Sequence, residues 1–96
     1  AAGALGDLDD ELVELKADLD AEDRRAEEVG DVLFAAVNVA RKLGVDPELE
    51  LRQATRRFVA RVEEAERLAA ADGHEWAKLP LAEQDRYFDL AKEAVR

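Results

Sequence analysis

The run VGDVLFAAVNVA at residues 29–40 constrains the fold more than any other segment of the chain. Its only strongly polar side chains, Asp31 and Asn38, are seven residues apart and therefore share one face of a helix. A helix that is apolar almost all round is usually buried. Because a buried carboxylate protonates or acquires a cation partner, Asp31 is expected to meet an Arg or Lys of another helix or a metal ion.

The polar face of this helix continues toward its N-terminus. The stripe contains Arg24, Glu28, Asp31 and Asn38, with the small Ala35 between the last two. Gly30 lies in the same helix, where glycine costs about 1 kcal/mol relative to alanine. We therefore expect another backbone or a ligand to approach Gly30 closely.

Length, charge and cysteine content limit the class of protein. The 96 residues suit one domain, whose small size would favour a homodimer. The net charge of −10 argues against binding a nucleic-acid polymer, although bridging divalent cations would still allow a phosphate-bearing ligand. The sequence has no cysteine, no run of 18 apolar residues and no leader pattern, so we expect a cytoplasmic protein that does not bind membranes.

Apolar residues recur at helical spacing along four segments. This predicts an all-α fold, a four-helix bundle whose longer helices pack antiparallel. Asp7 is expected to cap the first helix, after a frayed or truncated lead-in at residues 1–6. The second helix is expected at about residues 23–43 and should end at Gly44.

Turn signals also place the other two helices. Asp46 as N-cap and Pro47 as the first helical residue predict a third helix that runs to about residue 71. A loop anchored by Trp76 follows, and the fourth helix is expected at about residues 81–94. No strand-like alternation and no repeat is present, so the whole chain is expected to form one domain.

Two pairs of acidic residues carry the candidate chemistry. Glu11 and Glu14 are three residues apart on the first helix, as are Glu28 and Asp31 on the second. Two antiparallel helices that face each other in this way would place four carboxylates around one small space. Such hard oxygen ligands suit Mg²⁺ or Mn²⁺, and two such ions would activate water and stabilise a leaving oxygen.

A structural alternative stays open for these acids. With 24 acidic residues among 96, pairs at this spacing also arise by chance. Glu11 and Glu14 would then form a solvated face, and Arg57 or Arg61 would form salt bridges with the second pair. No glycine-rich phosphate loop and no Ser/His/Asp or Cys/His arrangement offers another catalytic centre.

Three segments resemble the MazG family of nucleoside triphosphate pyrophosphohydrolases. EEVGDVLFAAVNVARKLGVDPE at residues 27–48 is similar to the specific signature of that family. RFVARVEEAE at 57–66 is similar to its KFxxRFxxxE stretch, and LAEQDRYFDLAK at 81–92 to its terminal LxExxxxWxxxK helix. Together the resemblance covers about residues 8–93.

The resemblance implies a Mg²⁺-dependent enzyme that cleaves a nucleoside or deoxynucleoside triphosphate into the monophosphate and pyrophosphate. It also implies an all-α fold that works as a dimer. The metal motif of the family, EExxE followed by ExxD, assigns the catalytic metal ligands to Glu11, Glu14, Glu28 and Asp31. Its phosphate and nucleotide contacts fall on Arg24, Asn38, Arg57, Arg61, Phe88 and Lys92.

The chain departs from the family pattern at several positions. Asp10 replaces the first Glu of the metal motif, Arg57 replaces the usual Lys, and Phe88 replaces the usual Trp. The aromatic segment that often precedes the first helix is absent, so a truncation or a lost domain before Ala1 is expected. The alternative function is a non-catalytic helical dimerisation or nucleotide-sensing module with ion-paired carboxylates.

Overall fold

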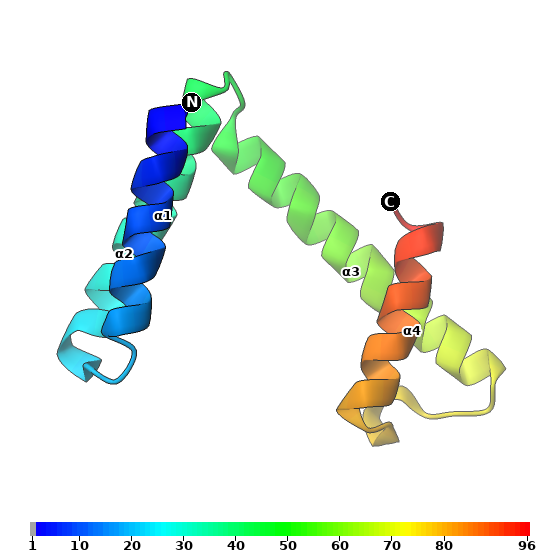
Figure 1. The fold of residues 1–96 in the computed structure, drawn as a ribbon. Helices are drawn as coiled ribbons and strands as arrows, with labels where there is room; N and C mark the ends of the chain where they lie inside the picture. Colours follow the sequence, from blue (N-terminus) through cyan, green and yellow to red (C-terminus); the bar gives the residue numbers. More distant parts are fainter. Residues whose placement is uncertain (1) are drawn as a thin grey trace. The chain divides into compact units, whose positions relative to one another are not determined.

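The computed structural model describes residues 2–96, and their regular structure is entirely helical (Figure 1). The elements are α1 (Ala2–Ala17), α2 (Glu22–Lys42), α3 (Pro47–Ala71), the 3₁₀ helix η1 (Trp76–Lys78) and α4 (Leu81–Ala94). The prediction of an all-α fold with four helices is confirmed. None of the described helices has both the length and the apolar character needed to span a membrane. The chain forms two compact units, Ala1–Glu50 and Leu51–Arg96, which are described separately.

Helix α1 begins earlier than the sequence predicts. Residues 2–6 are helical, so the expected frayed lead-in is wrong for them, and Ala1 lies outside the described residues. Asp7 consequently lies inside the helix and does not cap it. Ala4 is buried where α1 packs along α2, and this contact, with the high helix propensity of alanine, offsets the cost of Gly3 and Gly6.

Helix α2 occupies the predicted residues to within one position but is less buried than expected. Ala35 is its only buried residue, whereas Leu33 and Phe34 are 62% and 76% exposed. The physical reason is that α1 covers only one face of α2 within this unit. A Cβ atom added at Gly30 would meet no heavy atom within 4 Å, so the expected close approach there is also absent from the described chain.

The predicted turn residues act as expected. Gly44 follows the end of α2 with φ of +72°, a left-handed conformation that glycine adopts without strain. Asp46 Oδ1 accepts hydrogen bonds from the backbone N–H groups of Glu48 and Leu49 at 3.0 and 3.1 Å, which confirms Asp46 as the N-cap of α3. Both α3 and α4 begin and end at the predicted residues.

The core of the second unit is formed mainly by small residues of α3 and α4. Its buried cluster comprises Ala65, Ala69, Tyr87 and Ala91, with Leu68, Trp76 and Leu79 packed against it. Tyr87 Oη donates a 2.6 Å hydrogen bond to Asp72 Oδ2, and Gln84 Nε2 donates to the Trp76 carbonyl at 2.9 Å. Trp76 is therefore the loop anchor that the sequence predicts.

Candidate metal centre

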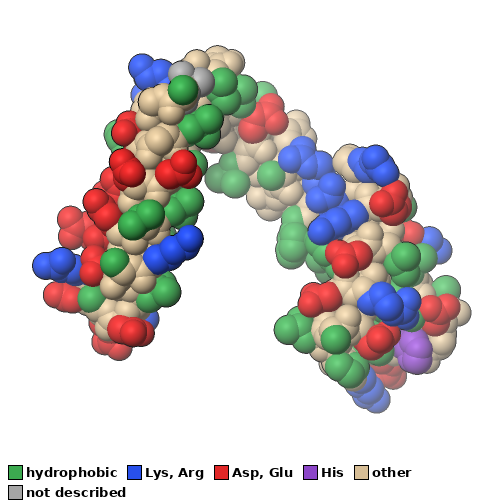
Figure 2. Space-filling model, in the orientation of Figure 1, with side chains coloured by type: hydrophobic (Ala, Val, Ile, Leu, Met, Phe, Trp, Pro, Cys, Tyr) green, Lys and Arg blue, Asp and Glu red, His purple; other side chains and the backbone are tan. Residues whose placement is uncertain are grey.

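The antiparallel helices α1 and α2 bring together three of the four predicted ligands. Glu11 and Glu14 on α1 and Glu28 on α2 each have a ligand oxygen within 4.8 Å of the other two. The spacing of three residues places the α1 pair on neighbouring turns, and the short connection at residues 18–21 folds α2 back beside them. Figure 2 shows many acidic side chains over this pair of helices.

Glu11 and Glu28 are half-buried, and neither carboxyl is fully satisfied. Oε2 of each residue is buried and has no hydrogen-bond partner among the described residues. Burial, followed by the negative charges of Glu14 and Asp31, raises the pKa of Glu11 above its ordinary value. Burial, a side-chain hydrogen bond with Asp18 and the charge of Glu14 raise the pKa of Glu28. The metal-free site therefore disfavours the ionised carboxylates that a cation would bind.

Asp31 lies beside this cluster but is exposed. It is not among the three mutually close ligand groups, although its negative charge acts on both Glu11 and Glu28. The expectation that Asp31 is shielded from solvent is wrong for the described chain, in which its side chain is exposed. Asp31 instead lines a pocket of about 330 Å³ between the two helices.

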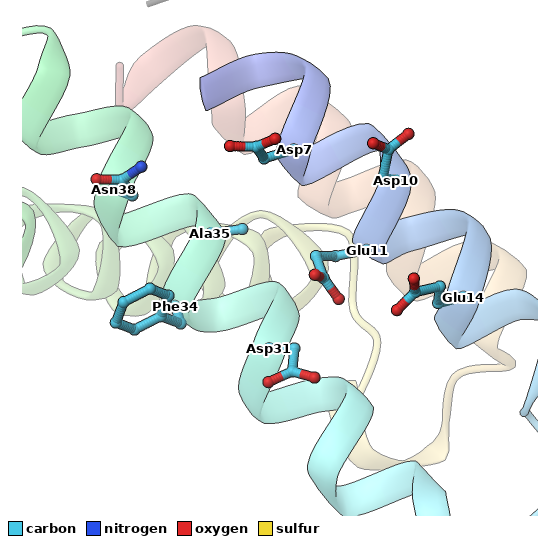
Figure 3. A pocket seen from close by; sticks show the side chains of 8 residues that line it. All are labelled: Asp7, Asp10, Glu11, Glu14, Asp31, Phe34, Ala35 and Asn38. Atoms are coloured by element: carbon cyan, nitrogen blue, oxygen red, sulfur yellow. The ribbon is translucent and has the colours of Figure 1, made fainter. Parts of the chain in front are cut away.

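This pocket also contains residues that sequence reasoning did not assign to the site. Figure 3 shows its walls, which come from both helices: Asp7, Asp10, Glu11, Glu14, Asp31, Phe34, Ala35 and Asn38. Asp7 precedes Glu11 by about one helical turn. Its spacing would have placed it on the same face as Glu11 if the helix had been predicted to begin earlier. Phe34 carried no such signal, because its apolar neighbours made it resemble a core residue. Asn38 lines the pocket, as its place on the polar stripe predicts.

Most of the other predicted substrate contacts lie in the second unit. Arg57 is exposed, and Arg61 is half-buried with its Nε donating a 2.7 Å hydrogen bond to the Val95 carbonyl. Lys92 Nζ lies 5.3 Å from the centroid of the Phe88 ring, which is 5.7 Å from the ring centroid of Phe58. A cation, an aromatic ring and an apolar surface therefore meet on this unit.

Arg24, the remaining predicted contact, is an exposed residue of α2. It does not line the pocket between α1 and α2. Among the described residues of the first unit, no Lys or Arg forms an ion pair with any of the four predicted ligands. The carboxylates there thus lack a protein cation from their own unit.

Known proteins are similar in sequence to most of this chain. Over 92 residues, 94% of the chain, the sequence is 45% identical to the nucleoside triphosphate pyrophosphohydrolase/pyrophosphatase MazG of Thermotoga maritima. Over 86 residues, 90% of the chain, it is 34% identical to the nucleoside triphosphate pyrophosphohydrolase of Escherichia coli K12. The chain is a MazG-like domain.

The MazG-like domain spans about a third of the length of these curated relatives: 35% of the Thermotoga protein and 33% of the Escherichia coli protein. It is also 39% identical over 69 residues to the uncharacterised protein YabN of Bacillus subtilis, of which it covers 14%. No family model and no solved structure matches the chain.

The carboxylates of the MazG-like domain fit a divalent metal ion. Two buried oxygens without donors are what a bound cation would satisfy, and the donor set is entirely carboxylate. Mg²⁺ and Mn²⁺ prefer such hard oxygen ligands. Glu11, Glu14 and Glu28 are the residues that would hold the ion, with Asp31 at the edge of the same pocket.

Proposed function

We propose that this MazG-like domain hydrolyses nucleoside or deoxynucleoside triphosphates to the monophosphate and pyrophosphate, with Mg²⁺ as cofactor. The observation that carries the proposal is the group of Glu11, Glu14 and Glu28, whose ligand oxygens lie within 4.8 Å of one another while two carboxyl oxygens lack any donor. The names of the relatives supply the reaction class, nucleoside triphosphate pyrophosphohydrolysis.

In this proposal some residues of the chain bind the metal ion and others bind the substrate. The carboxylates of Glu11, Glu14, Glu28 and Asp31 hold the metal. When bound, a divalent ion supplies Lewis-acid catalysis and lowers the pKa of water. The Asn38 side chain has both a donor and an acceptor and faces the same pocket, where it would bind the sugar.

The phosphates of the substrate need cations from the protein. We assign Arg24, Arg57, Arg61 and Lys92 to this role. A guanidinium group binds phosphate oxygens through two parallel hydrogen bonds, and the lysine ammonium group binds them as a compact positive charge. The bond from Arg61 Nε to the Val95 carbonyl restrains that guanidinium before substrate arrives. Phe88 would contribute its ring to nucleotide binding, beside the ammonium group of Lys92.

We also propose that the functional form is a homodimer. On α2 the side chains of Leu33 and Phe34 are 62% and 76% exposed, and on α3 Leu51 and Phe58 are 69% and 58% exposed. Burying apolar surface gains about 25 cal/mol per Å², and permanent dimers bury apolar surface of this kind. A second copy of the chain is the partner that an all-helical domain with so small a core would favour.

The test is pyrophosphate release from a panel of nucleoside and deoxynucleoside triphosphates with Mg²⁺, repeated with EDTA. Glu28→Gln keeps the size of the ligand but removes its charge, and Glu63→Gln makes the same change at an exposed residue of α3. We expect release that EDTA and Glu28→Gln abolish and that Glu63→Gln preserves. Mg²⁺-independent release, or equal rates in both variants, would refute the proposal.

A further inference from the structure

The second unit contains a groove of about 250 Å³ between α3, η1 and α4. Its apolar walls are Phe58, Val62, Trp76, Leu81 and Phe88. The ring centroids of Phe58 and Phe88 are 5.7 Å apart, with an angle of 51° between the ring planes. Aromatic side chains of this kind bind planar heteroaromatic rings by stacking, so the walls suit a flat ligand.

A cation borders this groove at Phe88. Lys92 Nζ lies 5.3 Å from the centroid of the Phe88 ring, which forms one wall. A ligand with a planar ring and a negative charge would find a partner for each part, and a nucleotide has this composition. An apolar side chain of a second copy would gain nothing from the lysine. Charge complementarity therefore favours a nucleobase as the occupant.

Two polar side chains of α4, Gln84 and Asp85, also line the groove. Gln84 Nε2 donates a 2.9 Å hydrogen bond to the Trp76 carbonyl. Because a carbonyl oxygen only accepts, this bond fixes the orientation of the amide and leaves its second N–H for a ligand. Asp85 forms no ion pair within the described part of the chain, and an ionised carboxylate offers acceptors only.

These polar groups match the edge of a guanine base. Guanine presents the O6 acceptor beside two donors, N1–H and the N2 amino group. The carboxylate of Asp85 would accept both donors in parallel, as carboxylates do from a guanidinium group, and the second N–H of Gln84 would donate to O6. Adenine, cytosine and uracil have no such pair of adjacent donors, so each would turn an acceptor atom toward the carboxylate.

We propose that Asp85 and Gln84 are specificity-determining residues that select guanine nucleotides, with the base stacked on the ring of Phe88. The inference rests on the proposed function and deepens it, because it names the preferred substrate among the nucleoside triphosphates. Asp85 contributes the pair of acceptors that discriminates between bases. Gln84, held by the Trp76 carbonyl, contributes the donor for O6.

The first test compares kcat/KM for GTP and ITP, because the base of ITP lacks only the N2 amino group of guanine. We expect wild type to favour GTP by about 10-fold, the order of discrimination that one matched pair of hydrogen bonds gives. Asp85→Asn replaces an acceptor by a donor and should bring the ratio of GTP to ITP close to 1. Equal kcat/KM for the two nucleotides in wild type, or an unchanged ratio in Asp85→Asn, would overturn the proposal.

Two further variants guard this comparison. Glu63→Gln changes an exposed carboxylate of α3 that does not line the groove, so it should keep the wild-type preference. Asp85→Ala removes both acceptors without adding a donor and should also abolish the preference. Asp85 is exposed, so neither substitution there should unfold the protein, and circular dichroism checks helix content.

The second test measures binding without metal or turnover. Trp76 is the only tryptophan of the chain and lines the groove, so its fluorescence reports occupation of the groove. In EDTA we expect GMP to change this fluorescence at about 10-fold lower concentration than IMP, and Asp85→Asn to remove the difference. Equal responses to GMP and IMP would overturn the proposal. So would fluorescence that depends on protein concentration and not on GMP, because a second copy would then fill the groove.

The two tests separate selectivity from the reaction. Selective binding of GMP without pyrophosphate release from any nucleotide would refute the proposed reaction and support guanine recognition by Asp85. Pyrophosphate release at equal rates from GTP and ITP would refute guanine recognition and leave the proposed reaction intact.

Discussion

Glu11 of α1 and Glu28 of α2 place ligand oxygens within 4.8 Å of each other, although each residue also has a buried Oε2 that no donor reaches. Like charges at this separation repel, and burial strengthens the repulsion by removing water. The described residues of the first unit provide no cation to offset it. The metal-free domain is therefore electrostatically strained at the place where the proposed function needs a cation.

Asp31→Asn tests the one predicted ligand that the structure leaves exposed. We expect turnover to fall by roughly 100-fold, the scale of losing one electrostatic group in an active site. We expect the melting temperature without metal to stay close to wild type, because substitutions at exposed positions usually change stability little. Steady-state pyrophosphate release and thermal melting measure the two effects. A variant with normal turnover would remove Asp31 from the metal centre.

The raised pKa values of Glu11 and Glu28 predict how stability depends on pH. Both groups bind protons more tightly in the folded state than in the unfolded state. The metal-free protein should therefore lose stability as the pH rises from the ordinary glutamate value of 4.5 through the raised values. Thermal melting in EDTA across this range measures the loss.

Glu28→Gln isolates the contribution of that carboxyl to the pH dependence. The amide does not titrate, so raising the pH should lower the melting temperature of wild type more than that of the variant. Mg²⁺ at neutral pH should restore the wild type, since a ligand that binds only the folded state stabilises it. A pH-independent difference would show that Glu28 is not strained in the folded protein.

Helix boundaries followed from the sequence wherever turn chemistry marks them. Asp46 and Pro47 start α3, and Gly44 adopts the left-handed conformation that ends α2. The start of α1 was misplaced because the first residues are small and show no helical pattern of apolar side chains, whereas Ala4 is buried in the folded unit. Packing between helices is not visible in local propensity.

The candidate site was likewise only partly predictable from the sequence. Spacing along each helix correctly grouped Glu11, Glu14 and Glu28, because residues three apart on facing helices converge. The burial expected around Asp31 was wrong because an apolar helix face does not reveal whether its cover comes from the same chain.

Tyr87→Phe tests the hydrogen bond that ties α4 to the end of α3. Tyr87 is 1% exposed, and its hydroxyl donates to Asp72 Oδ2 at 2.6 Å. Loss of this bond should lower the free energy of unfolding by roughly 1.5–3 kcal/mol, because the acceptor is a carboxylate. Urea denaturation at neutral pH measures the change. Asp72→Asn retains an acceptor and should cost less, and a larger loss in that variant would contradict this reading.

Leu33→Asp tests the proposed homodimer. Leu33 is 62% exposed in the single chain, so a polar substitution there should alter the stability of an isolated monomer by no more than about 0.5 kcal/mol. If a second copy covers this face of α2, the aspartate instead buries a charge in the interface and should convert the dimer to monomer.

Light scattering after size-exclusion chromatography measures the mass of the particle, and melting temperatures over a dilution series measure how stability depends on protein concentration. Glu63→Asp, at an exposed position of α3, is the control for surface substitution. A wild type that is monomeric at all concentrations, or an aspartate variant that remains dimeric, would exclude α2 as the dimer interface.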